Sequence, residues 1–354
     1  MPLEIQIIQS GDESPHSIIQ TRTTPLMLAF LRAYWFMISL LTLMAAGLSL
    51  GYAGNDRVLG FIQLVLKTQL ITPAILFLMA FTLDSSQIRA SFRAPGPVLW
   101  ACFVNAAVMP LMGYGAMSLQ LARHFEIGLM IAACVPCTVA AASVLTRKIG
   151  GNDAISLLTT LLTNGLCFLT APLWLRLTTG YEFVGNPLEL GLGLVLAVLL
   201  PSLLGQCVRV SSAAREFAKR RKPVLGAIAQ IGILLLVFSS ACKGGQKLHV
   251  PNLSSELKGL AVVWATCIGL HLLGLVIANY GARWLGFCEQ DRLAAAFAGS
   301  QKTLPVGLFV ASNVAFDSVQ FAIFPILMFH ASQLFIDSLI VDRHLKKAAA
   351  KVAI

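Results

Sequence analysis

Long apolar stretches, separated by short polar segments, run through almost the whole chain. A helix needs about 20 mainly apolar residues to cross the hydrocarbon core of a bilayer. The pattern therefore predicts an all-α membrane protein with ten transmembrane helices. In chain order, the predicted spans are Tyr34–Tyr52, Val58–Leu83, Pro97–Leu119, Ile127–Thr146, Ala154–Thr178, Leu188–Val208, Val224–Cys242, Leu260–Ala282, Leu293–Ala315 and Gln320–Val341.

The ten predicted spans divide evenly into two halves. We expect residues 26–180 to form a first five-helix unit and residues 187–343 a second one. Residues 1–25 and 344–354 are expected to be cytoplasmic tails, the first of them poorly ordered. The loops between the spans are too short to bury the core of a soluble domain. No catalytic domain is therefore expected outside the membrane.

The charged residues are few and unevenly distributed. They make up 12% of the chain, compared with about 25% in soluble domains. The formal net charge is +10, yet 18 of the 26 Lys and Arg residues fall on the side of the ten spans that carries both termini, and six on the opposite side. Cytoplasmic loops of membrane proteins carry such an excess. We therefore expect both termini to be cytoplasmic in a plasma or inner membrane, and no nucleic-acid partner.

Two predicted spans contain a polar interruption with a proline. The fourth contains Cys134–Ser143 and the ninth contains Ser300–Pro305, which includes a lysine. A lysine at the centre of a membrane helix costs about 2.5–3.5 kcal/mol on insertion scales, and proline removes a helical hydrogen bond. Each half has an odd number of spans, so the second half is expected to enter the membrane with opposite polarity. Interrupted helices at matching positions of inverted halves indicate the binding site of a transporter.

Several motifs in these spans resemble the bile acid:sodium symporter superfamily, most closely its sodium/bile acid cotransporter 7-like branch. These motifs are Pro136–Thr146, Gly150–Ala154, Gly299–Thr303, Phe81–Asp84 and Asn105–Pro110. The resemblance covers nearly all of the membrane part. It implies two inverted five-helix repeats, in which spans one, two, six and seven form a panel against a core where the broken helices four and nine cross. It also implies secondary active transport of an organic anion by alternating access, as a symport with sodium.

The sodium-binding residues of the superfamily are matched only in part. In sodium-coupled members the ninth helix carries an acid, followed four and five residues later by Gln and Asn. Here Phe297 stands at the acid and Lys302 at the Asn, while Gln301 matches. Pro136 and Pro305 are the implied helix breaks. The implied substrate- or ion-binding residues are Asn105, Thr138, Ser143, Ser156, Thr160, Ser300, Gln301, Lys302 and Thr303.

Lys302 offers a specific replacement for the lost acidic ligand. Its ammonium can stand in the place of a bound cation and donate to carbonyl and amide oxygens at the crossing. Exchanging an acid for this lysine leaves the predicted site formally positive, which favours an anionic substrate. Coupling to sodium and coupling to protons both stay open, as does a lysine that extends to the membrane surface. No cofactor is expected, and sodium is implied as a coupling ion. The expected partners are a small anionic organic substrate and the lipid bilayer.

Two other function classes also stay open. One is a non-transporting regulator of membrane ion homeostasis. The other is an intramembrane enzyme that uses His271, His330 and Asp337 as an acid–base or metal set. The paired interruptions favour a transporter, because hydrolysis does not require inverted symmetry, so we do not expect an enzyme. Cys134 and Cys137 have the spacing of a redox pair, but the strand–helix context of such a pair is missing, and small residues at a helix crossing explain them better.

Overall fold

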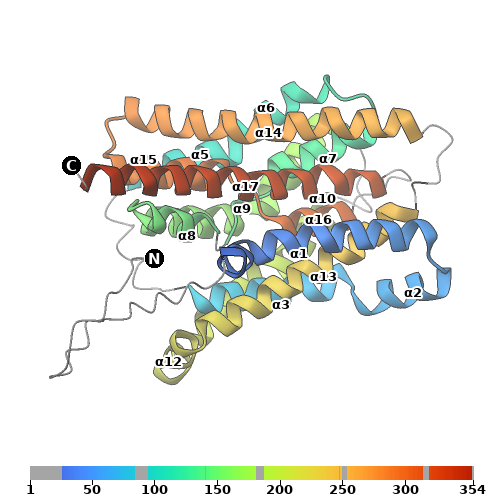
Figure 1. Ribbon diagram of the computed structural model, residues 1–354, viewed down its shortest axis with the longest axis horizontal. Helices are drawn as coiled ribbons and strands as arrows, with labels where there is room; N and C mark the ends of the chain where they lie inside the picture. The colour runs from blue at the N-terminus through green and yellow to red at the C-terminus, as the bar shows by residue number, and fades with distance from the viewer. Residues whose placement is uncertain are drawn as a thin grey trace, which may run out of the picture. The chain divides into compact units, whose positions relative to one another are not determined.

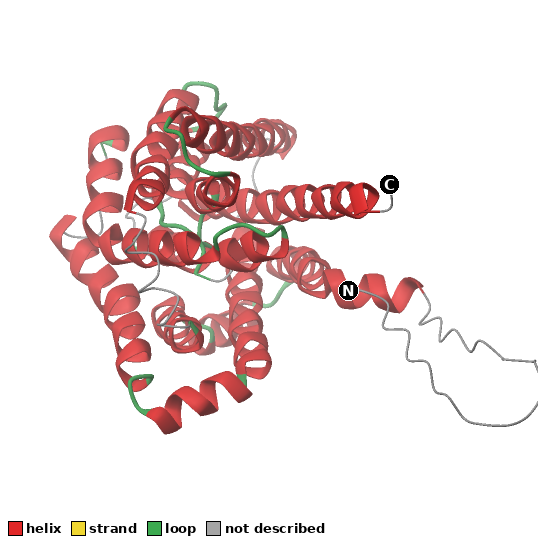
Figure 2. Ribbon diagram, turned by 90° about the vertical axis from the view of Figure 1, so that its left-hand side faces the viewer, coloured by secondary structure: helices red, strands yellow, loops and turns green. Residues whose placement is uncertain are grey.

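Helices account for all the regular secondary structure in the part of the chain that the structure describes (Figure 2). The computed structural model describes residues 26–83, 95–139, 141–180, 187–246, 248, 253–313 and 319–352. The chain divides into two compact units, Met1–Trp35 and Phe36–Ile354, and every contact discussed below lies within the second. The N-terminal tail predicted at 1–25 lies outside the described residues, as does Asp84.

The helices are labelled in Figure 1. In chain order they are α1 (Leu26–Ala53), α2 (Asp56–Val65), α3 (Thr68–Thr82), α5 (Pro95–Phe103), η1 (Val104–Val108), α6 (Met109–Met117), α7 (Arg123–Cys134), α8 (Ala141–Lys148), α9 (Asp153–Thr179), α10 (Pro187–Leu194), η2 (Val195–Leu199), α11 (Leu200–Val208), α12 (Ser212–Arg220), α13 (Lys222–Gln246), α14 (Leu253–Trp284), α15 (Glu289–Ser300), α16 (Leu304–Ser312) and α17 (Val319–Val352).

Eight helical segments of the described chain are long and apolar enough to cross a membrane. They are α1, α2–α3, α5–α6, α9, α10–α11, α13, α14 and α17. Large apolar side chains such as Leu70, Leu177 and Leu196 are exposed on these segments, which fits a surface surrounded by lipid rather than water. The chain is a multi-pass membrane protein.

The second predicted span is not one continuous helix. α2 and α3 are separated at Leu66 and Lys67. Asn55 begins α2 as its N-cap, and its side chain accepts a hydrogen bond from the N–H of Arg57. Lys67 begins α3 in extended backbone without a side-chain cap bond. α3 packs against α11 and α13, so the helices of this region bury one another's apolar faces.

Two of the long segments contain a π-helical turn just before a proline. η1 precedes Pro110 and η2 precedes Pro201. Proline has no N–H, so Pro110 leaves the carbonyl of Ala106 without its helical donor. Trp174 of α9 donates from Nε1 to that carbonyl oxygen at 2.8 Å. The widened turn η1 carries Asn105, which is buried.

The fourth and ninth predicted spans are each broken into two short helices. α7 ends at Cys134 and α8 begins at Ala141, and residues 135–139 between them are not helical. α15 ends at Ser300 and α16 begins at Leu304. Pro136 lies within the first interruption. Pro305 lies in the first turn of α16, where a missing N–H costs no helical hydrogen bond.

The second interruption separates α15, which packs against α14, from α16, which packs against α17. α14 packs against α15 and α17, and α17 packs against α7. Gly128 of α7 permits this last contact, because a Cβ atom there would lie 2.4 Å from the carbonyl oxygen of Ala322. α17 remains helical to Val352, so most of the tail predicted at 344–354 continues this helix.

Candidate functional site

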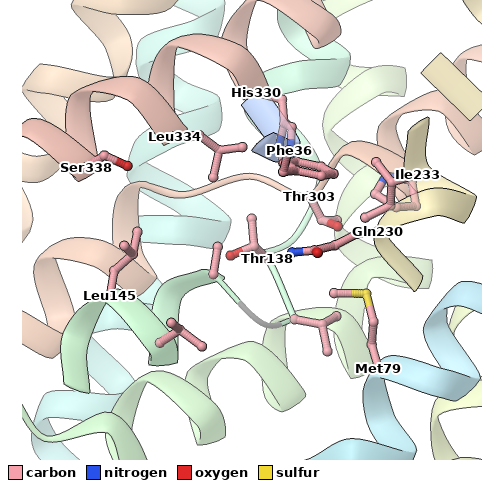
Figure 3. Close-up of a pocket in the computed structure, with 14 residues that line it drawn as sticks. Phe36, Met79, Thr138, Leu145, Gln230, Ile233, Thr303, His330, Leu334 and Ser338 are labelled. Carbon is pink, nitrogen blue, oxygen red and sulfur yellow. The ribbon is translucent and has the colours of Figure 1, made fainter. Parts of the chain in front are cut away.

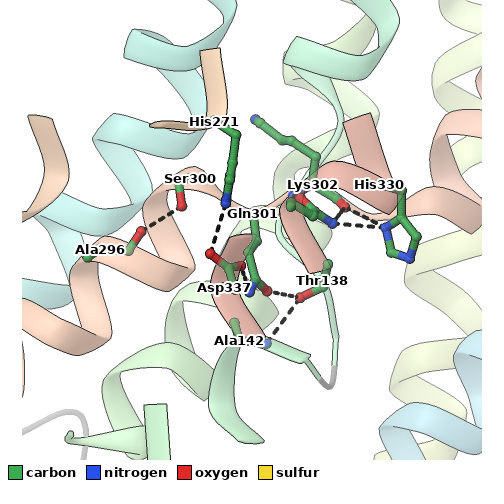
Figure 4. A network of polar contacts seen from close by, with 10 residues as sticks. Thr138, Ala142, His271, Ala296, Ser300, Gln301, Lys302, His330 and Asp337 are labelled. Atoms are coloured by element: carbon green, nitrogen blue, oxygen red, sulfur yellow. Dashed lines mark hydrogen bonds and ion pairs between the residues drawn. The ribbon is translucent and has the colours of Figure 1, made fainter. Parts of the chain in front are cut away.

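The two interruptions meet inside the protein, as Figure 4 shows in part. Thr138 Oγ1 donates to Gln301 Oε1 at 2.6 Å. The N–H of Thr303 donates to the carbonyl oxygen of Pro136 at 2.9 Å. Backbone groups that two broken helices cannot pair internally are thus paired across the crossing, as burial requires.

The ammonium of Lys302 lies within this crossing. The residue is 2% exposed, and Nζ donates to the carbonyl oxygens of Asn105 at 2.7 Å and Val135 at 2.9 Å. The side-chain oxygen of Asn105 lies 3.4 Å from Nζ. Among the described residues, no carboxylate lies within ion-pair distance of this ammonium. Lys302 therefore points inward to backbone oxygens and does not extend to a surface.

Asn105 holds the end of α15 against the π turn. Its Nδ2 lies 3.2 Å from the carbonyl oxygens of Ala298 and Gly299, and 2.9 Å from that of Gln301. These carbonyls have no helical donor because α15 ends here. Asn105 thus satisfies the end of one broken helix and also contacts Lys302.

A fully buried carboxylate joins the site from α17. Asp337 Oδ2 accepts from Gln301 Nε2 at 2.6 Å, and Oδ1 lies 2.9 Å from His271 Nε2. From the sequence, Asp337 was a candidate only for an alternative enzyme, and its contact with Gln301 was not predicted. At the position of the superfamily's acid, Phe297 packs in an apolar cluster with Leu145. A carboxylate thus reaches Gln301 from α17, whereas position 297 of α15 carries none.

The role of Gln333 was not predicted from the sequence either. Its side-chain amide forms hydrogen bonds with both backbone polar groups of Lys302. The N–H of Lys302 donates to Gln333 Oε1 at 2.8 Å, and Gln333 Nε2 donates to the carbonyl oxygen of Lys302 at 2.7 Å. Gln333 Nε2 also lies 2.9 Å from His330 Nδ1. Because an amide nitrogen only donates, His330 Nδ1 accepts in this shorter contact, while the carbonyl oxygen of Lys302 lies farther away, at 3.4 Å from the same atom.

The predicted site residues are brought together only in part. Thr160 Oγ1 donates to the carbonyl oxygen of Thr138 at 3.1 Å, so Thr160 joins the crossing. Ser156 Oγ contacts Thr146 and the carbonyl of Ala294. Ser300 Oγ donates back along its own helix to Ala296 at 2.8 Å. Ser143 is buried on α8.

The three residues of the alternative enzyme do not form one set. His271 pairs with Asp337, whereas His330 bonds to Gln333. Within the described ranges, no group of three or more His, Cys, Asp or Glu residues could hold a metal ion. Cys134 and Cys137 are buried free thiols.

A cavity of about 240 Å³ opens beside the crossing (Figure 3). Its polar lining comes from Thr138, Thr303, His330, Gln230 and Ser338, and the remainder is apolar. The apolar lining residues are Phe36, Met79, Val139, Ala141, Val144, Leu145, Ile233, Pro305 and Leu334. The cavity therefore meets both interruptions and the N-terminal turns of α8 and α16.

Residues 34–346 match the profile of the SBF-like CPA transporter family (DUF4137). The chain belongs to this family of membrane transporters. The resemblance inferred from the sequence motifs is thereby confirmed, and the family is one of transporters rather than enzymes.

Relatives at modest identity agree with the family assignment. Sodium/bile acid cotransporter 7 of Danio rerio is 27% identical over 218 residues, which is 60% of this chain and 63% of the relative. The probable sodium/metabolite cotransporter BASS4 of Arabidopsis thaliana is 26% identical over 317 residues, which is 86% of this chain and 72% of the relative. Uncharacterized protein PA2026 of Pseudomonas aeruginosa is 31% identical over 72% of this chain and 78% of the relative. The chain thus spans less than two thirds of the cotransporter 7 relative.

Proposed function

We propose that this protein is a secondary transporter of an organic anion, in which the ammonium of Lys302 stands where a coupled cation would bind. The observation that carries the proposal is the position of that ammonium. It donates to the carbonyl oxygens of Asn105 and Val135, one on a π turn and one at a helix break. Freed carbonyls at broken helices are the groups that hold coupling cations in transporters. A built-in ammonium satisfies them without sodium.

The arrangement of the helices supports alternating access. The eight long segments, together with the pairs α7–α8 and α15–α16, would make ten spans. The broken pairs then fall at the fourth place in each half, as expected for two inverted five-helix repeats with a panel and a core. In this proposal the crossing moves against the panel and exposes the cavity to either side of the membrane in turn.

The charges at the crossing correct one expectation. The exchange of an acid for Lys302 predicted a formally positive site, but Asp337 contacts Gln301, the residue next to Lys302. With both groups ionised, the formal charges of Lys302 and Asp337 cancel. An anion would therefore be held mainly by the N-terminal turns of α8 and α16, whose dipoles favour negative charge, with His330 beside them in the cavity wall.

Uptake into proteoliposomes tests the proposal. Purified protein would be offered a panel of labelled aromatic and aliphatic carboxylates and sulfonates, with and without sodium and a pH gradient. We expect saturable uptake of at least one anion that persists without sodium. Failure of every anion to bind or enter would refute organic-anion transport. Uptake that occurs only with sodium would refute the role given to Lys302.

A further inference from the structure

A chain of hydrogen bonds connects the buried Asp337 to the cavity (Figure 4). His271 Nε2 lies 2.9 Å from Asp337 Oδ1, and because an ionised carboxylate only accepts, Nε2 carries a proton and donates to it. Gln301 Nε2 donates to Asp337 Oδ2 at 2.6 Å. The other end of the same amide, Oε1, then accepts from the hydroxyl of Thr138 at 2.6 Å. Every donor in this chain points toward the carboxylate.

The direction of these hydrogen bonds limits the donor and acceptor capacity that the Thr138 hydroxyl keeps for a bound molecule. A hydroxyl has one donor and two acceptor lone pairs. The donor of Thr138 is used by Gln301, and one lone pair accepts the N–H of Ala142 at 3.2 Å. Thr138 lines the cavity, and its remaining capacity is one acceptor. At this point the cavity wall therefore selects an O–H or N–H group.

We propose that Asp337 is a positioning residue that sets the hydrogen-bonding polarity of the cavity at Thr138. The inference rests on the proposed function and narrows its substrate class to organic anions that also carry an O–H or N–H donor. The anionic group would lie toward the N-terminal turns of α8 and α16, and the donor would reach Thr138. Asp337 never touches the substrate and acts only through Gln301.

Replacing Asp337 with Asn reverses the direction of donation along these hydrogen bonds. The shape of the side chain at position 337 stays nearly the same. The oxygen of Asn still accepts from His271, so its amide nitrogen faces Gln301 and needs an acceptor there. The Gln301 amide must then turn, which places Nε2 against Thr138 Oγ1. Thr138 now accepts from both Gln301 and Ala142, and its hydroxyl proton is free to donate into the cavity. The same wall then accepts an ether oxygen that the wild type rejects.

A matched pair of fluorescent anions tests this reversal. 6-Hydroxy-2-naphthoate carries a donor, and 6-methoxy-2-naphthoate carries only an acceptor at the same place. Binding would be measured with the full-length protein in lipid nanodiscs. A mismatched buried hydrogen bond changes affinity by roughly tenfold. We expect the wild type to bind the hydroxy compound about tenfold more tightly than the methoxy compound. In Asp337→Asn this affinity ratio should fall to near one, because the affinity for the methoxy compound rises.

Four further variants separate positioning from a merely structural role. Thr138→Ser keeps the hydroxyl and should keep the wild-type preference, whereas Thr138→Val should lose it. In Thr138→Val, a second change of Asp337→Asn should alter the preference no further. His271→Gln retains a donor to Asp337 and should resemble the wild type.

Each outcome decides the inference. An unchanged preference in Asp337→Asn, with both anions bound, overturns the role of Asp337 and leaves anion transport standing. Equal weakening of both anions by Asp337→Asn would show a structural role only and also overturns it. If neither naphthoate binds the wild type and no anion of the uptake panel is transported, the proposed function and the inference fall together. If neither binds but another anion is transported, the cavity does not pair Thr138 with a donor on the anion, and the inference alone fails.

Discussion

Replacing Lys302 with Met is the most informative single change. Methionine is close to lysine in length but carries no charge and no donor. Hydrogen bonds from a charged group contribute roughly 1.5–3 kcal/mol each, and Lys302 makes two short ones, of 2.7 and 2.9 Å. Their loss therefore costs about 3–6 kcal/mol. About 2.5–3.5 kcal/mol is regained because the ammonium no longer has to be buried.

The two contributions largely cancel in global stability but not in function. We expect Lys302→Met to insert and to unfold within a few degrees of the wild type, because the opposed energies are of similar size. The carbonyls of Asn105 and Val135, however, lose the cation that pairs them. If the state of the crossing that binds the anion is weakened by about 3 kcal/mol, the lower end of the range for the two lost hydrogen bonds, uptake should fall roughly 100-fold.

Proteoliposome uptake of the best anion from the panel measures the effect, with thermal unfolding in detergent as the folding control. Lys67→Met is the matched control, because Lys67 is exposed and its side chain makes no cap bond. Normal uptake by Lys302→Met would refute the reasoning. So would an equal loss of uptake in both variants.

Three further predictions address the topology, the ion dependence and the packing. Cysteines introduced at Lys258 and Arg220 in a cysteine-free background should react with a membrane-impermeant reagent from outside at Lys258 only; reaction at Arg220 alone contradicts cytoplasmic termini. Lys302→Gln should make uptake depend on sodium, because it removes the built-in cation while the carboxylate of Asp337 stays at the crossing, and sodium-independent uptake would count against this. Trp174→Phe removes the donor to the carbonyl freed by Pro110 and should destabilise the protein by about 1 kcal/mol in thermal unfolding; Trp284→Phe, which changes a side chain that is 91% exposed, should not.

The helix breaks and their meeting point could be predicted from the sequence. Pro136 and the run Ser300–Pro305 are local signals, since proline and a charged residue are costly inside a membrane helix. The matching places of the two breaks, in the fourth and ninth spans, then predicted that Thr138 and Gln301 would lie close together, as they do.

The partners from α17 could not be predicted in the same way. Asp337 and Gln333 contact the crossing because α17 presents one face to it, and the rotation of a helix is set by packing against its neighbours rather than by its own sequence. His330 and Asp337 lie two turns apart, which was a usable signal, but nothing local connected them to Gln301. The π turn at Asn105 was not predicted either, and the donor that pairs the carbonyl left free by Pro110 comes from Trp174 of a helix distant in the sequence.

The sodium dependence of anion uptake tests the central claim most directly. Wild-type protein in proteoliposomes would be assayed with the transported anion in sodium buffer and in choline buffer, at equal ionic strength and a clamped membrane potential. Because the ammonium of Lys302 already occupies the carbonyls of Asn105 and Val135, we predict the same initial rate in both buffers. A rate that rises steeply with sodium and vanishes in choline would contradict the claim.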